Sequence, residues 1–110
     1  MITNSQICAL SDRIAEIFHP DKIILFGSYA YGTAQQYSDV DLLVILPFKE
    51  KNFRKSLEIM NRVKPEFMTD ILARCPEDVA MRYSAGDPLI REAVDKGKVL
   101  YESDHPRMDK

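Results

Sequence analysis

The 110-residue sequence contains only two cysteines and two histidines. Cys8 and Cys75 are far apart and form no CxxC arrangement, which favours buried free thiols in a reducing compartment over a disulfide or a zinc site. His19 falls at a predicted helix end and His105 in a predicted tail, so neither is expected to carry chemistry. The sequence therefore offers little for thiolate or imidazole catalysis.

Long apolar runs and an excess of basic residues are also missing. No run approaches the roughly 20 apolar residues of a membrane span, and Met1 to Leu10 lacks the regions of a signal peptide. We therefore expect a cytoplasmic protein without a membrane partner. Fifteen Lys and Arg against seventeen Asp and Glu give a net charge of −2, which disfavours direct nucleic-acid binding because that needs a basic field.

Length and composition predict a single domain. A chain of this size buries roughly 65% of its unfolded surface, which leaves no length for a second substrate-binding domain. Hydrophobic residues make up 45% and charged residues 29%, ordinary values for a globular protein. We predict one domain over residues 1–103 and a disordered tail over 104–110.

Hydrophobic periodicity and Gly/Pro positions predict helices that alternate with short strands. The predicted strands are 22–26, 38–46, 66–75 and 98–102. The predicted helices are about 7–18, a short turn after Ser28, 52–63, a segment from Pro76, and 88–96. This alternation predicts the α/β (α+β) fold class, with a small mixed β-sheet and helices packed on it.

Residues 26–46, FGSYAYGTAQQYSDVDLLVIL, combine two glycines with two closely spaced aspartates. Alternate side chains of a strand share a face, so Asp39 and Asp41 are expected to point the same way. At about 5–6 Å and an effective dielectric of about 20, their repulsion is on the order of 3 kcal/mol. A fold would not retain it without a cation or a proton. With no His or Cys nearby, the carboxylate oxygens favour Mg²⁺, or Mn²⁺, over zinc.

Gly27 and Ser28 follow the first predicted strand and precede the short predicted helix. Backbone N–H groups are free to hold an anion at such a place, and the Ser28 hydroxyl adds a donor. Gly32 permits a positive φ before the chain enters the second strand. If the first two strands are adjacent, phosphates held here lie near the aspartate pair.

Asp70 lies in the third predicted strand, with Met68 and Leu72 on its own face and Thr69 and Ile71 on the other. A lone carboxylate in such an apolar strand is costly unless it has a role. If this strand pairs beside the second, Asp70 approaches the aspartate pair. It then acts as general base for an attacking hydroxyl or as a third metal ligand.

Each pattern also has a simpler explanation. A Gly-Ser dipeptide is usually only a turn, and Ser38-Asp39 fits the end of a turn that merely starts the strand. Asp41 fits an exposed edge position, and Asp70 alone fits a structural role. A solvated helix face is a more common use than triphosphate binding for Lys49, Lys51, Arg54 and Lys55. Packing of the loop is a more common use than stacking on a nucleotide base for Tyr29, Tyr31 and Tyr37.

Gly27-Ser28, ten residues, and then Asp39-Val40-Asp41 match the pattern of the minimal nucleotidyltransferase (MNT) domain. The chain resembles this branch of the DNA polymerase β-like nucleotidyltransferase superfamily from about residue 7 to 102. Its ending, TDILARCPEDVAMRYSAGDPLIREAVDKGKVLYE, is also similar to that of the family. The resemblance implies a polymerase β-like nucleotidyltransferase fold, ATP as substrate and two Mg²⁺ ions. It implies metal-binding and catalytic roles for Asp39, Asp41 and Asp70, and nucleotide binding by Gly27, Ser28 and Ser38.

In the minimal family the usual companion is a small helical HEPN protein, and the pair resembles a toxin–antitoxin system. The resemblance implies a type VII-like antitoxin that transfers AMP from ATP to a tyrosine of a HEPN toxin and forms a hetero-oligomer with it. Two alternatives stay open: transfer to a small hydroxylated molecule, and neutralisation of the partner by binding without catalysis. An adjacent reading frame for a HEPN protein would favour the first hypothesis over the small-molecule one.

Overall fold

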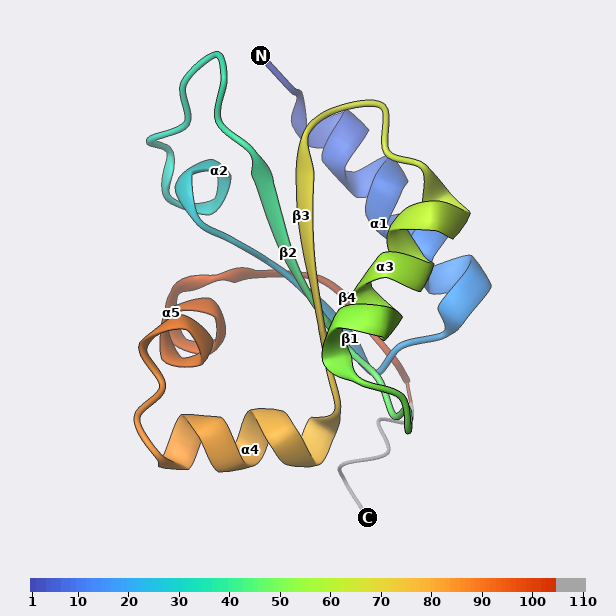
Figure 1. Cartoon of the computed structure of the whole chain (residues 1–110). Helices are drawn as coiled ribbons and strands as arrows, with labels where there is room; N and C mark the ends of the chain where they lie inside the picture. Colours follow the sequence, from blue (N-terminus) through green and yellow to red (C-terminus); the bar gives the residue numbers. More distant parts are fainter. Residues whose placement is uncertain (105–110) are drawn as a thin grey trace.

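The computed structural model describes residues 1–104, which form five helices and four strands (Figure 1). In chain order they are α1 (Asn4–Phe18), β1 (Lys22–Phe26), α2 (Ser28–Tyr31), β2 (Val40–Ile45), α3 (Asn52–Val63), β3 (Thr69–Arg74), α4 (Pro76–Ser84), α5 (Pro88–Lys96) and β4 (Lys98–Glu102). The expected alternation of helices and strands is confirmed.

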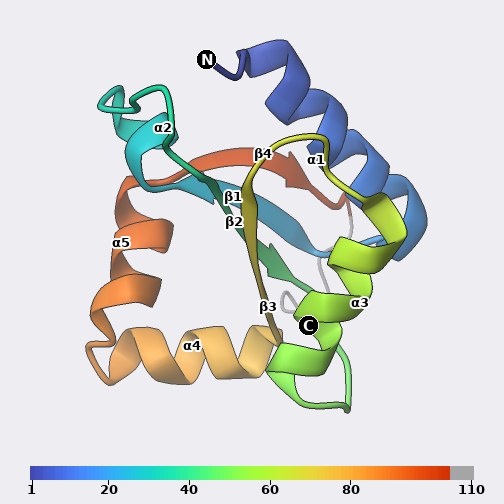
Figure 2. The ribbon, with the colours of Figure 1, turned by 45° about the horizontal axis from the view of Figure 1, so that its top comes forward.

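The strands form one mixed sheet in the order β3-β2-β1-β4. β1 is antiparallel to both β2 and β4, whereas β2 and β3 are parallel and are joined through α3. The end of β1 therefore lies at the same edge of the sheet as the starts of β2 and β3. The four-residue helix α2 sits at that end in both views (Figures 1 and 2).

The central strands are buried on both faces, and their side chains enter two cores alternately. The core under α1 and α3 includes Ile14, Ile23, Leu25, Val40, Leu42, Val44, Ile59, Val63, Ile71 and Ala73. The core under α4 and α5 includes Ile24, Phe26, Leu43, Ile45, Val79, Ile90 and Ala93. Figure 2 shows the two pairs of helices on opposite sides of the sheet. Asp41 and Asp70 share strand parity with the second core, so they face the α4/α5 side.

Polar contacts set the ends of the helices. Thr3 and Gln6 form a reciprocal capping box at the start of α1, which satisfies two backbone donors. Asp87 accepts hydrogen bonds from the N–H groups of Leu89 and Ile90 at 3.0 and 3.1 Å, and Pro88 occupies the first helical position of α5. Proline is favoured there because it lacks an N–H that would have no intrahelical acceptor.

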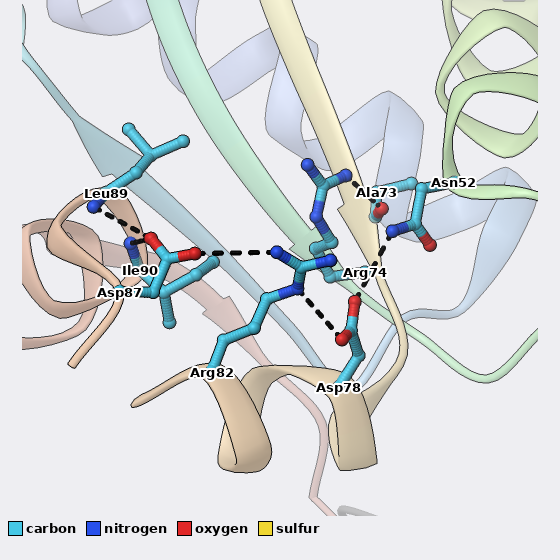
Figure 3. A network of polar contacts seen from close by, with 8 residues as sticks. All are labelled: Asn52, Ala73, Arg74, Asp78, Arg82, Asp87, Leu89 and Ile90. Atoms are coloured by element: carbon cyan, nitrogen blue, oxygen red, sulfur yellow. Dashed lines mark hydrogen bonds and ion pairs between the residues drawn. The ribbon is translucent and has the colours of Figure 1, made fainter. Parts of the chain in front are cut away.

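A network of polar side chains joins the start of α3, the helix α4 and the start of α5 (Figure 3). The Arg82 Nε donates to Asp78 at 2.9 Å, and Arg82 also lies 3.5 Å from Asp87. Asn52 donates from its side chain to the second oxygen of Asp78 at 3.3 Å. The network fixes α4 and α5 relative to α3 at the end of the sheet opposite α2.

Several expectations are corrected in detail. The second strand begins at Val40 instead of residue 38, because the Ser38 N–H donates to Gln35 O in a turn and not to a neighbouring strand. The third strand covers only Thr69–Arg74 instead of 66–75. Cys8 is exposed, because it lies outside the buried stripe of α1, and Cys75 is only half-buried.

The predicted tail over 104–110 lies outside the described residues except for Asp104. Just before it, the Ser103 N–H donates to Asp21 O at 2.9 Å. Within residues 1–104, no helix is both long and apolar enough to cross a membrane.

Candidate active site

Three segments bring the acidic residues together at the end of the sheet near α2. Phe26, the last residue of β1, is the register partner of Asp41 on β2, and Asp41 is the partner of Asp70 on β3. Residues directly opposite each other on neighbouring strands have side chains on the same face. The sequence analysis required β1 to pair with β2, and β2 to pair with β3. Both pairings are present.

Gly27 lies directly against the Asp41 carboxylate. Its backbone has a φ of 77°, in the left-handed region that favours glycine. A Cβ built at this position would overlap Asp41 Oδ2 and come within 3.2 Å of its Cγ. Both the conformation and the space therefore require glycine at the turn from β1 into α2.

The segment from Ser28 to Ser38, which includes α2, connects β1 to β2 at this end of the sheet. Gly27 O accepts hydrogen bonds from Ala30 and Tyr31 N–H at 3.0 and 3.2 Å, and Ser28 O accepts from Thr33 N–H at 3.0 Å. The Ser38 hydroxyl oxygen accepts from Gln35 N–H at 2.8 Å, which fixes the side chain just before β2. Ser28 directly follows Gly27, and Ser38 directly precedes Asp39.

Asp39 and Asp70 are exposed, whereas Asp41 is half-buried. Asp39 directly precedes β2 and shares the strand parity of Asp41. The exposure of Asp70 corrects the argument that burial makes this carboxylate costly: β3 is an edge strand, and Asp70 sits at its open end. The acidic set therefore offers both a half-buried carboxylate and two carboxylates that solvent can reach.

The electrostatics of the site concentrate on Asp41. Burial, followed by the negative charges of Asp70, Asp39 and Glu92, raises its pKa from 3.8 to about 6. All the neighbours that shift its pKa are acidic, so a proton or a cation is needed to relieve the repulsion. The same charges make the carboxyl a strong site for a hard cation.

The donor set fits Mg²⁺ in its usual manner of binding. Within residues 1–104, no group of three or more His, Cys, Asp or Glu side chains could hold a metal ion by itself. Mg²⁺ is typically held by one or two carboxylates, with water and substrate phosphates completing its shell. A carboxylate pair beside the turn at Gly27 meets that requirement.

Glu92 was not singled out from the sequence. It lies on α5, accepts a hydrogen bond from the Tyr31 hydroxyl at 3.0 Å, and contributes to the raised pKa of Asp41. Burial and this hydrogen bond raise the pKa of Tyr31. The contact joins α2 to α5 across the site, and only the packing of α5 on the sheet could have revealed it.

The structure also separates the alternatives for the tyrosines. Tyr29 packs against the core, and its hydroxyl accepts from Ile2 N–H at 3.4 Å, so the packing explanation applies to it. Tyr31 is bound to Glu92. Tyr37 is 90% exposed and lines a hollow of about 570 Å³ together with Ser38 and Asp39, which leaves its ring available to stack on a base.

The basic residues of the α3 region lie away from the carboxylates. They follow the end of β2, whereas the aspartates stand at its start, and a six-residue strand is about 20 Å long. Lys55 pairs with Glu50 at 3.7 Å and Glu58 at 3.1 Å and lies over the Phe18 ring. The solvated helix face is therefore the better explanation for this group.

Comparison with known proteins agrees with the site. The model of the nucleotidyltransferase domain family matches residues 7–101, and the chain belongs to this family. The protein MJ1305 of Methanocaldococcus jannaschii, which is assigned as a protein adenylyltransferase, is 37% identical over 90 residues. That match covers 76% of this chain and 59% of MJ1305, so the chain spans less than two thirds of the relative.

Solved structures agree on the fold. A protein of Sulfolobus solfataricus assigned as a nucleotidyltransferase superposes with a TM-score of 0.64 at 15% identity, covering 93% of this chain and 82% of that one. A toxin–antitoxin structure determined with AMP-PNP gives a TM-score of 0.57 at 22% identity, covering 94% of this chain and 76% of that one. The predicted polymerase β-like nucleotidyltransferase fold is thus confirmed.

Proposed function

We propose that this protein transfers AMP from ATP to a hydroxyl group of a polypeptide and that its acceptor is a tyrosine of a HEPN toxin, which it thereby neutralises. One observation carries the proposal: Asp41 and Asp70 are opposite each other on β2 and β3, beside the turn at Gly27, which lies directly against the Asp41 carboxylate. Family membership supports nucleotide chemistry at this site.

The position of each residue in the site suggests a different role for it in the transfer. Asp39 and Asp41 would hold Mg²⁺, which neutralises charge on the triphosphate when it is bound. Gly27, Ser28 and Ser38 would contact the phosphates, since they surround the carboxylates at the turn into α2 and at the start of β2. Exposed Asp70 stands where an acceptor reaches it from solvent.

In the transfer, the acceptor oxygen attacks the α-phosphorus of ATP and forms the new O–P bond. The bond from that phosphorus to the oxygen that bridges to the β-phosphate breaks, and pyrophosphate leaves with the electron pair. Asp70 takes the proton of the acceptor hydroxyl. Its alternative role, as a further metal ligand, would make it as important for nucleotide binding as for chemistry.

The choice of a polypeptide acceptor rests on the relatives. MJ1305 is assigned as a protein adenylyltransferase, and a structural neighbour belongs to a toxin–antitoxin complex determined with AMP-PNP. A hydroxyl on a small molecule is the second candidate.

The test is incubation of the purified protein with Mg²⁺, radiolabelled ATP and either a candidate HEPN protein, sought in an adjacent reading frame, or a control protein. We expect label and a mass increase equal to AMP on the HEPN protein alone. The Asp39→Asn/Asp41→Asn double variant should keep the fold and lose transfer, because it removes the ligand charges together with their repulsion. Tight complex formation without label would instead favour neutralisation by binding.

A further inference from the structure

A groove of about 440 Å³ runs between α3 and the outer edge of β3. It is lined by Asn52, Phe53, Ser56, Leu57, Met60, Thr69, Asp70, Ile71, Leu72 and Arg74. Because Asp70 is in this lining, the groove reaches the proposed proton acceptor of the active site. β3 forms one edge of the described sheet, so no strand of residues 1–104 covers this side.

The backbone of β3 alternates between its two neighbours. Val40 N–H donates to Met68 O, and Leu46 N–H donates to Arg74 O. Even-numbered residues of this segment therefore direct their N–H and C=O groups toward β2, and the odd-numbered residues Thr69, Ile71 and Ala73 direct theirs toward the groove.

Side chains satisfy only the far part of this edge. The Ala73 N–H donates to Ser56 Oγ at 2.9 Å, and Ala73 O accepts from the Arg74 guanidinium at 2.8 Å (Figure 3). Within residues 1–104, no hydrogen bond engages the backbone of Thr69 or Ile71 on the groove side. The part of the edge that remains open is the part that flanks Asp70.

The other wall of the groove is apolar and exposed. Phe53 and Leu57 on α3 are 75% and 47% exposed, while the buried face of α3 consists of Ile59 and Val63. Neighbouring apolar side chains on an exposed groove wall are typical of a binding surface. Open backbone groups on one side and apolar side chains on the other are the features that an extended polypeptide recognises.

We infer that this groove binds the acceptor as an extended segment that pairs with the backbone of Thr69 and Ile71. The inference rests on the proposed transfer and specifies its acceptor. A residue paired opposite Asp70 has its side chain on the same face as Asp70, so its hydroxyl stands beside the carboxylate that takes its proton. Its sequence neighbours point to the opposite face and contact the apolar wall of α3.

The first test compares two substitutions on exposed helix positions. Leu57→Glu places a charge in the groove, and Met81→Glu makes the same change on α4, where Met81 is 63% exposed. We expect Leu57→Glu to raise the KM for the HEPN protein about tenfold, as for the loss of one central contact. Its KM for ATP and its folding should stay unchanged, and Met81→Glu should behave as wild type. Equal KM values for the HEPN protein in Leu57→Glu and wild type would overturn the proposal that the groove binds the acceptor.

The second test measures amide hydrogen exchange at Ile71 with the HEPN protein added to the wild-type chain. Pairing should slow exchange at Ile71 at least tenfold, while an exposed-loop amide such as that of Gln36 should not change. Label on the HEPN protein with unchanged Ile71 exchange would overturn the groove alone. Slower exchange without label would overturn the proposed AMP transfer but support binding of the HEPN protein in the groove. If neither slower exchange nor label were observed, both proposals would be overturned.

Discussion

Asp41 and Asp70 are register partners on the parallel strands β2 and β3, so two carboxylates face the same side of the sheet. One is half-buried and the other exposed. Ionisation is unfavourable at the half-buried Asp41, because burial and then the charges of Asp70 and Asp39 raise its pKa to about 6. Because the two carboxylates differ in burial, the ionisation of Asp41 and its need for a cation can each be measured.

The stability of the metal-free protein should fall as pH rises through 6. The folded-state pKa of Asp41 lies above its ordinary value of 3.8, so its contribution is fully present below 3.8 and is lost as pH rises through about 6. After discounting for solvent screening, about 1 kcal/mol is at stake. Calorimetry between pH 3.5 and 7 should show Asp41→Asn losing about 4 °C less in Tm than wild type. Parallel curves would contradict the raised pKa, and Asp12→Asn, on the exposed face of α1, is the control.

Replacement of Asp70 should separate chemistry from nucleotide binding. Asp70→Asn removes the proposed proton acceptor, so kcat should fall by about 10²- to 10⁴-fold, with KM for ATP within about twofold of wild type. It should also lower the pKa of Asp41, because the second largest cause of the shift is the charge of Asp70. Transfer kinetics and a carboxyl NMR titration measure the two effects. A matching rise in KM for ATP would identify Asp70 as chiefly a metal ligand.

The sequence was sufficient for the elements and for the spacing of the acidic pair, because both depend on local periodicity. The pairing of β2 with β3 could only be stated as a condition, since α3 and its loops lie between the two strands in sequence. Exposure was harder to predict. Asp70 is exposed because β3 is an edge strand, and Phe53 and Leu57, which line the groove along that edge, lie outside the core as well.

Glu92 shows a different limit of the sequence. Nothing in the local pattern of α5 distinguishes this glutamate from other surface residues, and its role depends on the packing of α5 beside α2. The Tyr31–Glu92 hydrogen bond joins residues that are 61 positions apart. Contacts of that kind follow from the assembled sheet and helices and leave no periodic signal.

Ser56 should stabilise the edge of β3. Its hydroxyl donates to Asn52 O and accepts from Ala73 N–H, both at 2.9 Å, so Ser56→Ala leaves a backbone donor without its partner. The expected loss is about 1–2 kcal/mol in the free energy of unfolding. Denaturant titration measures it, with the exposed Ser84→Ala on α4 as the matched control. Equal stability of the two variants would mean that water replaces the hydroxyl at Ala73.

Gly27 and Gly86 offer a matched pair for the active-site turn. Both have a positive φ, 77° and 85°, so alanine strains the backbone at either place by about 1 kcal/mol or more. A Cβ at Gly86 meets nothing within 4 Å, whereas at Gly27 it overlaps the Asp41 carboxylate. Gly86→Ala should therefore lose only stability, and Gly27→Ala should lose more stability together with Mg²⁺-dependent transfer.

The pair is compared by denaturant titration and by AMP transfer at saturating ATP, at a temperature where both variants are folded. Because the backbone strain is common to both variants, any additional loss at Gly27 measures the contact with Asp41. Equal losses would mean that the carboxylate moves aside without consequence and that the close contact has no role in the site.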